Sequence, residues 1–239
     1  MTDDPATAHP PKRALVIVAH PDDPEFAAGG TIARWTGEGH VVWYVIATDG
    51  SKGSSDPAMT PDRLAALRQV EQRAAATALG VTAVTFLGFV DGEIAPDLDL
   101  RHAITREIRR FRPDIVVTHD PASLYWDNFI NHPDHRAVGQ ATLDAIYPTA
   151  RDRLNAAHLL AEGLEPHVVR EVYLTGPHRP DTYSDISATL DRKLAALRAH
   201  KSQIGDFEAM EKRLRDRHAG FAEGREMTYA EVFKRIEFL

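Results

Sequence analysis

The fold of this chain is decided by the stretch Ala14–Asp23, which reads ALVIVAHPDD. Its first half is a continuous apolar run rich in β-branched residues, and such a run is typical of a strand that is buried on both faces of a parallel sheet. The run stops abruptly at His20. Asp23 and Pro24 then suit the N-cap and the first position of a helix that begins near Glu25. A strand followed at once by a helix indicates the first half of a βαβ unit.

The same alternation continues along the chain. Further strands are predicted at Val41–Ala47, Val84–Phe89, Asp114–Thr118 and Val168–Thr175, and helices at Glu25–Gly37, Asp62–Leu79, Leu100–Phe111, His135–Tyr147, Ala188–Ala199, Phe207–Arg217 and Met227–Ile236. Short apolar strands alternating with helices predict a three-layer α/β fold, with a mainly parallel sheet, helices on both faces and a helical C-terminal region. No linker divides the chain, so we expect a disordered lead-in over residues 1–12 and a single domain over residues 13–239.

Composition narrows the class of protein. The 239 residues are 43% hydrophobic and 26% charged, which is typical of globular proteins. The net charge of −7 argues against a nucleic-acid partner. The chain contains no apolar run of the roughly 18–20 residues that a membrane span needs, and its first residues lack the pattern of a secretory signal. We therefore expect a cytoplasmic protein without membrane insertion.

Polar side chains follow the predicted strands at the point where each strand ends. The segment 20–23 follows the first strand, Asp49 the second, Asp91 the third, and His119 ends the fourth. Ligands of open parallel sheets bind outside the carboxyl ends of the strands. We therefore expect a site at this edge, although a surface turn before Pro121 is an equally good interpretation of His119.

Two short motifs carry metal-binding chemistry. In the first, His20 and Asp23 lie three residues apart in a turn, with Asp22 between them; the second is HPDH at residues 132–135. A zinc hydrolase needs three protein ligands and an open position for water. Because the chain has no cysteine, its ligands would be nitrogen and oxygen atoms. A carboxylate beside the water, as Asp22 would be, can accept the proton of that water.

Helix capping is the alternative interpretation of both motifs. Asp23 and Asp134 each precede a predicted helix, where an aspartate commonly caps the backbone. For the first motif taken alone, capping and metal binding are equally good explanations. Two such motifs in one cysteine-free chain favour the metal.

These motifs resemble those of the LmbE-like, PIG-L-type N-acetylglucosaminyl deacetylases. The resemblance rests mainly on residues 19–25 (AHPDDPE), Gly29–Thr31 and residues 131–135 (NHPDH), with weaker agreement over most of the remaining chain. It implies a Rossmann-like fold and a catalytic Zn²⁺. It further implies zinc ligands at His20, Asp23 and His135.

The resemblance also implies roles for the neighbouring side chains. Asp22 would be the general base, and His132 the electrophile or general acid that stabilises the oxyanion and assists the departing amine. The resemblance implies supporting roles, either behind the metal ligands or in contact with the substrate, for Asp134, Arg68, Asp91 and His200. In one branch of the family, the deacetylases of thiol cofactors, a tyrosine precedes the motif's first histidine by two residues, but here that position is Ile130. We ask whether Tyr125 replaces that tyrosine.

Several functions follow from this pattern. The first is zinc-dependent removal of an N-acetyl group from an amino sugar or a related small molecule. An alternative keeps the site but cleaves a larger N-acyl group, as a thiol-conjugate amidase or an antibiotic-pathway deacylase would. A third, of another class, is a non-catalytic nucleotide-binding module that needs no metal. Members of this family often form multimers, so homo-oligomerisation is a further expectation.

Overall fold

The computed structural model describes residues 10–238 and is built around one seven-stranded sheet, with strand order β3-β2-β1-β4-β7-β9-β8. Its strands are β1 (Arg13–Val18), β2 (Val41–Thr48), β3 (Ala83–Phe89), β4 (Ile115–His119), β7 (Glu171–Thr175), β8 (Thr182–Asp185) and β9 (Ala230–Glu237). The strands from β3 to β7 in this order run parallel, whereas β9 is antiparallel to both β7 and β8. The predicted mainly parallel sheet is confirmed.

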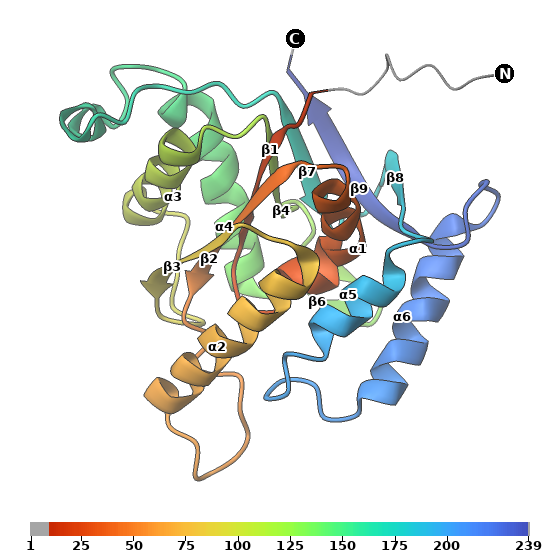
Figure 1. The fold of residues 1–239 in the computed structure, drawn as a ribbon. Coiled ribbons are helices and arrows are strands. Elements are labelled where there is room, and N and C mark those ends of the chain that lie inside the picture. Colours follow the sequence, from red (N-terminus) through yellow and green to blue (C-terminus); the bar gives the residue numbers. More distant parts are fainter. Residues whose placement is uncertain (1–9, 239) are drawn as a thin grey trace, which may run out of the picture.

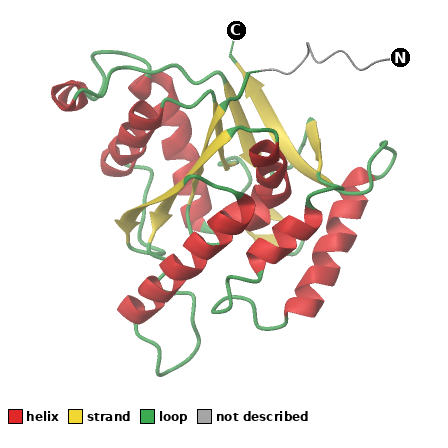
Figure 2. Cartoon of the chain, in the orientation of Figure 1, coloured by secondary structure: helices red, strands yellow, loops and turns green. Residues whose placement is uncertain are grey.

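Helices cover both faces of the sheet, as Figures 1 and 2 show. The α-helices are α1 (Asp23–Gly37), α2 (Pro61–Leu79), α3 (Leu98–Phe111), α4 (Pro133–Asp144), α5 (Leu190–Leu197) and α6 (Phe207–Ala222). Helices α1, α2 and α5 contact one another on one face, while α3 packs with α4 on the other. Two short helical segments, η2 (Ala145–Ala150) and η3 (Ala157–Glu162), follow α4. The predicted three-layer α/β architecture is confirmed.

Burial on both faces explains the continuous apolar run of β1. Leu15 and Ile17 belong to the core under α3 and α4, whereas Val16 and Val18 belong to the core under α1 and α2. All four side chains are fully buried. Successive strand residues point to opposite faces, so a central strand covered on both sides needs apolar residues at every position.

The C-terminal region differs from the prediction. A helix over Met227–Ile236 is wrong, because Ala230–Glu237 forms the strand β9 between β7 and β8. Glu231 is 1% exposed and pairs with the buried Lys193, so a charged residue occupies an inward position and hides the apolar alternation of a strand. Of the predicted lead-in over residues 1–12, residues 1–9 lie outside the described part of the chain.

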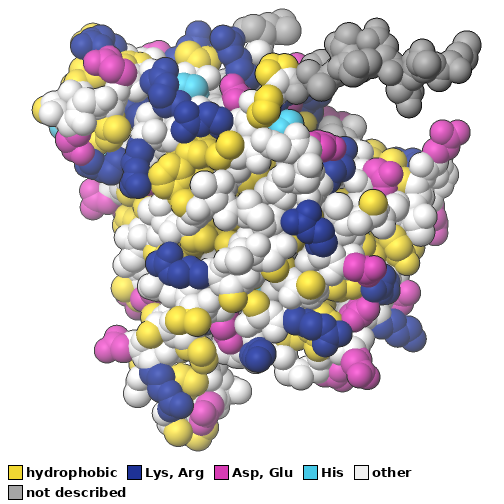
Figure 3. All heavy atoms as spheres, viewed as in Figure 1, with side chains coloured by type: hydrophobic (Ala, Val, Ile, Leu, Met, Phe, Trp, Pro, Cys, Tyr) yellow, Lys and Arg dark blue, Asp and Glu magenta, His cyan; other side chains and the backbone are white. Residues whose placement is uncertain are grey.

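Two further features were not predicted from the pattern. Strand β8 lies where no element is predicted, and the segment before residue 131 contains a hairpin of β5 (Tyr125–Trp126) and β6 (Phe129–Ile130). Figure 3 shows acidic and basic side chains distributed among one another on the face that it presents. Within residues 10–238, none of the helices combines the length and apolar character that a bilayer span requires.

Candidate metal centre

The first motif lies where β1 ends, next to β4 in the sheet. The strand order reverses direction at this point, because β2 lies on one side of β1 and β4 on the other. Helix α1 begins at Asp23, and its N-cap is Asp22, whose φ of 96° is left-handed and whose side chain makes no capping hydrogen bond. The predicted N-cap at Asp23 is therefore wrong by one residue. The tight left-handed turn brings Asp23 back under His20, whose N–H donates to Asp23 Oδ2 at 2.7 Å.

Three potential ligands meet at this turn. His20 Nδ1 lies 3.3 Å from Asp23 Oδ2, and His135 Nε2 lies 3.2 Å from Asp23 Oδ1. One ligand atom from each of these residues lies within 4.8 Å of the other two. The structure thus brings together the three residues predicted as metal ligands, from the turn after β1, from α1 and from α4.

Helix α4 presents His135 to the cluster. Its N-cap is His132, whose Nδ1 accepts a hydrogen bond from the N–H of Asp134 at 3.2 Å. Asp134 is inside the helix, so its predicted place as the N-cap is wrong. On the far side of the ring, His135 Nδ1 lies 3.1 Å from Asn131 Oδ1. Asn131 Nδ2 donates to the carbonyl of Ser123 at 2.7 Å, which directs Asn131 Oδ1 toward His135 and leaves His135 Nε2 for Asp23 or an ion.

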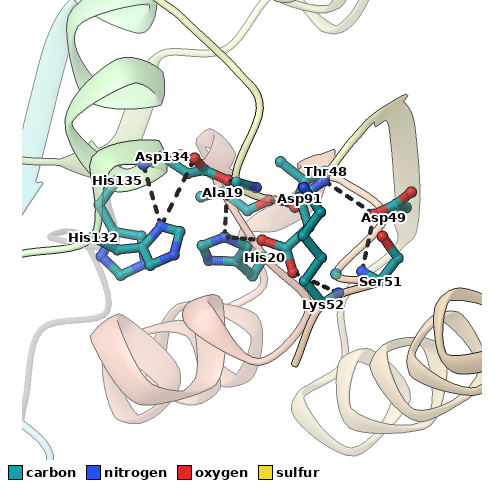
Figure 4. Close-up of polar contacts among 12 residues, drawn as sticks. Ala19, His20, Thr48, Asp49, Ser51, Lys52, Asp91, His132, Asp134 and His135 are labelled. Carbon is teal, nitrogen blue, oxygen red and sulfur yellow. Dashed lines mark hydrogen bonds and ion pairs between the residues drawn. The ribbon is translucent and has the colours of Figure 1, made fainter. Parts of the chain in front are cut away.

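His20 is held through its second ring nitrogen. Nε2 lies 3.2 Å from Asp91 Oδ1 and 3.2 Å from Asp134 Oδ2 (Figure 4). Asp91 also accepts from the N–H of Lys52, and Asp134 from the N–H of Gly92. Carboxylates on the outer nitrogen of a ligating histidine fix the ring and its tautomer. His20 also belongs to a second group that could hold a metal ion, together with Asp91 and His132.

The carboxylates around His20 favour positive charge at this position. Burial alone would lower the pKa of His20, but hydrogen bonds that its ring donates to Asp134 and Asp23, and the charge of Asp23, raise it to about 12. Burial would raise the pKa of Asp91, yet the hydrogen bond to His20 holds it near 2. A proton on His20 thus supplies positive charge among several carboxylates. Two imidazole nitrogens and a carboxylate form a donor set that suits Zn²⁺, and such an ion would take over that charge.

Asp22 lies beside the cluster with a different environment. Burial, and then the charge of Asp23, raise the pKa of Asp22 to about 7, while Arg68 opposes the shift. Arg68 Nη2 contacts Asp22 Oδ2 at 3.2 Å and also donates to the carbonyl of Pro21. The side chain of Arg68 is 5% exposed, so it supports the turn from the protein interior.

His119 belongs to the site, although a surface turn was an equally good expectation for it. It is buried at the end of β4, and its Nε2 accepts from the N–H of Ala19 at 3.1 Å. Its ring stacks on His135 with centroids 4.1 Å apart and planes at 5°. Burial, followed by the charge of His135, lowers the pKa of His119 to about 4. A neutral His119 therefore supports the ring of His135.

His200 is fully buried, with Nε2 3.1 Å from Glu25 Oε2. Because it is buried, His200 supports the site from the protein interior and does not contact a substrate. Glu25 itself was missed as a supporting residue, because an acidic residue in a first helical turn needs no explanation beyond the helix dipole.

Tyr125 lies directly opposite Ile130 in the β5–β6 hairpin, and both are exposed, at 62% and 77%. Directly opposed residues of a hairpin share one face. The side chain of Tyr125 therefore lies beside Ile130, the position at which the deacetylases of thiol cofactors have a tyrosine. A cavity of about 560 Å³ lies elsewhere, between Phe26 of α1 and residues 203–217. None of the three proposed metal ligands lines this cavity.

Known proteins resemble the chain over most of its length. The model of the PIG-L family, described as GlcNAc-PI de-N-acetylase, matches residues 15–146. A diacetylchitobiose deacetylase from Thermococcus kodakarensis is 37% identical over 193 residues, which are 81% of this chain and 70% of that protein.

Two solved structures share its fold. The N,N'-diacetylchitobiose deacetylase of Pyrococcus horikoshii superposes with a TM-score of 0.88 at 31% identity, covering 95% of this chain and 84% of that one. The 4-carboxy-2-hydroxymuconate hydratase of Pseudomonas putida superposes with a TM-score of 0.78 at 26% identity, covering 95% and 97%.

Proposed function

This chain belongs to the PIG-L family, and from that membership we propose that it is a zinc-dependent deacetylase that hydrolyses the acetamido group of an amino sugar or a related small molecule. The observation that carries the proposal is the cluster of His20, Asp23 and His135, whose ligand atoms lie within 4.8 Å of one another. Relatives described as deacetylases of N-acetylated sugars support the same substrate class. We further propose that residues 13–239 act as one domain, since β1 and β9 belong to one sheet.

In this proposal His20, Asp23 and His135 hold Zn²⁺. A bound zinc ion would supply Lewis-acid chemistry, since it polarises an amide carbonyl and makes water more acidic. Asp22 accepts a proton from the water as the water oxygen attacks the carbonyl carbon. A pKa near 7 is well matched to that role at neutral pH.

His132 donates to the oxygen that becomes negative. Its Nδ1 accepts from the backbone of Asp134, so we infer that the neutral ring carries its proton on Nε2. Burial, followed by the charge of His20, lowers the pKa of His132 and favours this neutral form. A neutral ring suits an electrophile better than a general acid. The proton held by Asp22 then passes to the nitrogen as the carbon–nitrogen bond breaks, which releases acetate and the free amine.

The replacement Asp22→Asn tests this mechanism. It keeps the shape of the side chain and removes the base, so we expect zinc to remain bound at one ion per chain and turnover to fall by about 10²–10⁴-fold. Elemental analysis measures the zinc, and release of acetate from N-acetylated mono- and disaccharides measures turnover. If Asp22→Asn cleaves these amides at the wild-type rate, the assignment of the base is wrong.

Removal of the metal tests the proposed cofactor. Chelation should abolish acetate release, and added Zn²⁺ should restore it. Full activity in a protein that elemental analysis shows to be free of metal would exclude the zinc mechanism. Stoichiometric zinc would exclude the alternative of a metal-independent nucleotide-binding module.

Two alternatives keep the site and change the reaction. Hydrolysis of a larger N-acyl group is distinguished by a series of substrates whose acyl chains increase in length. The resemblance to a hydratase favours addition of water as the second alternative. That reaction consumes an unsaturated acid and releases no acetate, so absorbance of the unsaturated acid and acetate release separate the two.

A further inference from the structure

A row of buried polar side chains lies behind Asp22 and reaches the C-terminal half of the chain. The N–H of Asp22 donates to Gln72 Oε1 at 2.7 Å. Gln72 Nε2 donates to the two carboxylate oxygens of Glu25 at 3.0 and 3.1 Å. Glu25 Oε2 lies 3.1 Å from Nε2 of His200. Gln72, Glu25 and His200 are all 0% exposed, so water does not replace any of these contacts.

The charge of Glu25 sets the direction of this row. An ionised carboxylate only accepts hydrogen bonds, so the amide of Gln72 has to turn its NH₂ group toward Glu25. The amide oxygen of Gln72 then faces the opposite way, toward Asp22. His200 donates to the same carboxylate from the other side and stabilises its buried charge.

The backbone of Asp22 needs such support. A residue with a side chain rarely adopts a φ of 96°, and a strained conformation of this kind persists only where its surroundings hold it. The side chain of Asp22 makes no capping bond that would help. Its carbonyl accepts from the N–H groups of Glu25 and Phe26 in the first helical turn. On its other side, the hydrogen bond from its N–H to Gln72 and the contact of its carboxylate with Arg68 hold it.

We propose that Glu25, Gln72 and His200 are positioning residues that fix the left-handed backbone of Asp22 and thereby aim its carboxylate into the site. They touch neither substrate nor metal, and they act through Asp22. The effect on turnover rests on the function proposed above, in which Asp22 is the base. The effect on the backbone of Asp22 does not depend on that function.

Gln72→Glu tests the direction of the row. The new carboxylate still accepts from the N–H of Asp22, but it faces Glu25 across the short contact that the amide now bridges. The two negative charges repel each other, and the contact between positions 72 and 25 is lost. We expect kcat to fall by about 10²-fold, as for a misplaced catalytic group, while KM changes little.

The exchange Gln72→Glu with Glu25→Gln in one protein restores a consistent row. The carboxylate at position 72 accepts from Asp22 and from the amide at position 25, whose oxygen accepts from His200. We expect about tenfold recovery of kcat over Gln72→Glu alone, which a purely additive pair of changes would not give.

Glu71→Gln is the matched control. Glu71 is also buried on α2, next to Gln72, but it accepts from the N–H and hydroxyl of Ser202 and does not touch Asp22. We expect Glu71→Gln to lower the thermal midpoint without the loss of kcat seen in Gln72→Glu. Equal losses of kcat in the two variants would mean that general loosening explains the effect.

Hydrogen–deuterium exchange at the amide of Asp22, resolved by NMR, provides a readout that needs no substrate. We expect faster exchange in Gln72→Glu and in Glu25→Gln, and slow exchange again in the double variant. Wild-type exchange rates in both single variants would overturn the proposal, even if neither the wild-type protein nor any variant hydrolysed an N-acetyl sugar. Should Gln72→Glu fail to fold, the nearly isosteric Glu25→Gln decides the question by itself.

Discussion

Replacing Asn131 with alanine would remove the group that orients the third proposed metal ligand. Asn131 Oδ1 lies 3.1 Å from His135 Nδ1, and its amide nitrogen is bound to the carbonyl of Ser123. The alanine variant leaves the ring of His135 in place, stacked on His119. It removes the acceptor that keeps the ring proton on Nδ1 and the lone pair of Nε2 directed toward Asp23, together with the donor to Ser123.

The size of the effect follows from that single contact. Loss of a hydrogen bond that orients a ligating histidine typically weakens metal binding by about 10–100-fold. That range corresponds to roughly 1.4–2.7 kcal/mol of binding free energy. The lost bond to Ser123 lowers the free energy of unfolding by about 1 kcal/mol, because it anchors the hairpin to its base.

Competition with a chromophoric chelator measures the Kd for zinc in each variant. Asn128→Ala is the control, since it makes the same substitution at an exposed position of the same hairpin turn. We expect its Kd to equal that of the wild-type protein. If Asn131→Ala binds zinc as tightly as the control does, Asn131 does not orient His135 for the metal and the reasoning fails.

Three further predictions concern stability. In Gly139→Ala a Cβ would lie 2.4 Å from the carbonyl oxygen of His119, so α4 must move and thermal unfolding should show a loss of about 1–3 kcal/mol. Lys193→Ala leaves Glu231 buried without its partner, and urea unfolding should show a loss of about 3–5 kcal/mol. Burial, followed by the charge of Lys193, lowers the pKa of His218 to about 4. Below pH 6.5 the unfolded chain therefore binds a proton at this position that the folded chain does not. This contribution to stability is complete above pH 6.5 and is lost as the pH falls to 4, by about 3 kcal/mol. Denaturation at several pH values should show a weaker dependence in His218→Gln.

The parallel half of the sheet was predictable because its strands are buried on both faces. The run Ala14–Val18 is buried at every position, so it needs a continuous apolar sequence that is recognisable without the rest of the chain. Strand β9 was not predictable in the same way. Its pairing with β7 and β8 joins distant segments, and the buried Glu231 is stabilised by Lys193 and by the N–H groups of Gly30 and Thr31, which all lie on other elements.

The part of the candidate site that lies within the two short motifs was predictable. His20, Asp23 and His135 lie in two short segments whose spacing suits a metal, and the structure brings all three together. The conformation of Asp22 was not predictable, because a left-handed backbone at a non-glycine residue depends on contacts that hold it. Gln72 and Asn131 likewise have ordinary local sequences, and their partners become apparent only in three dimensions.

Strand β9 also determines what an incomplete chain would lack. It is the last strand in the chain, yet it lies inside the sheet between β7 and β8. A chain truncated before Ala230 would leave β7 with an open edge and Lys193 without Glu231, although both candidate metal-binding motifs would still be present. Such an edge invites association with other chains and attack by proteases. Loss of this one strand would therefore open the sheet without removing any of the three proposed metal ligands.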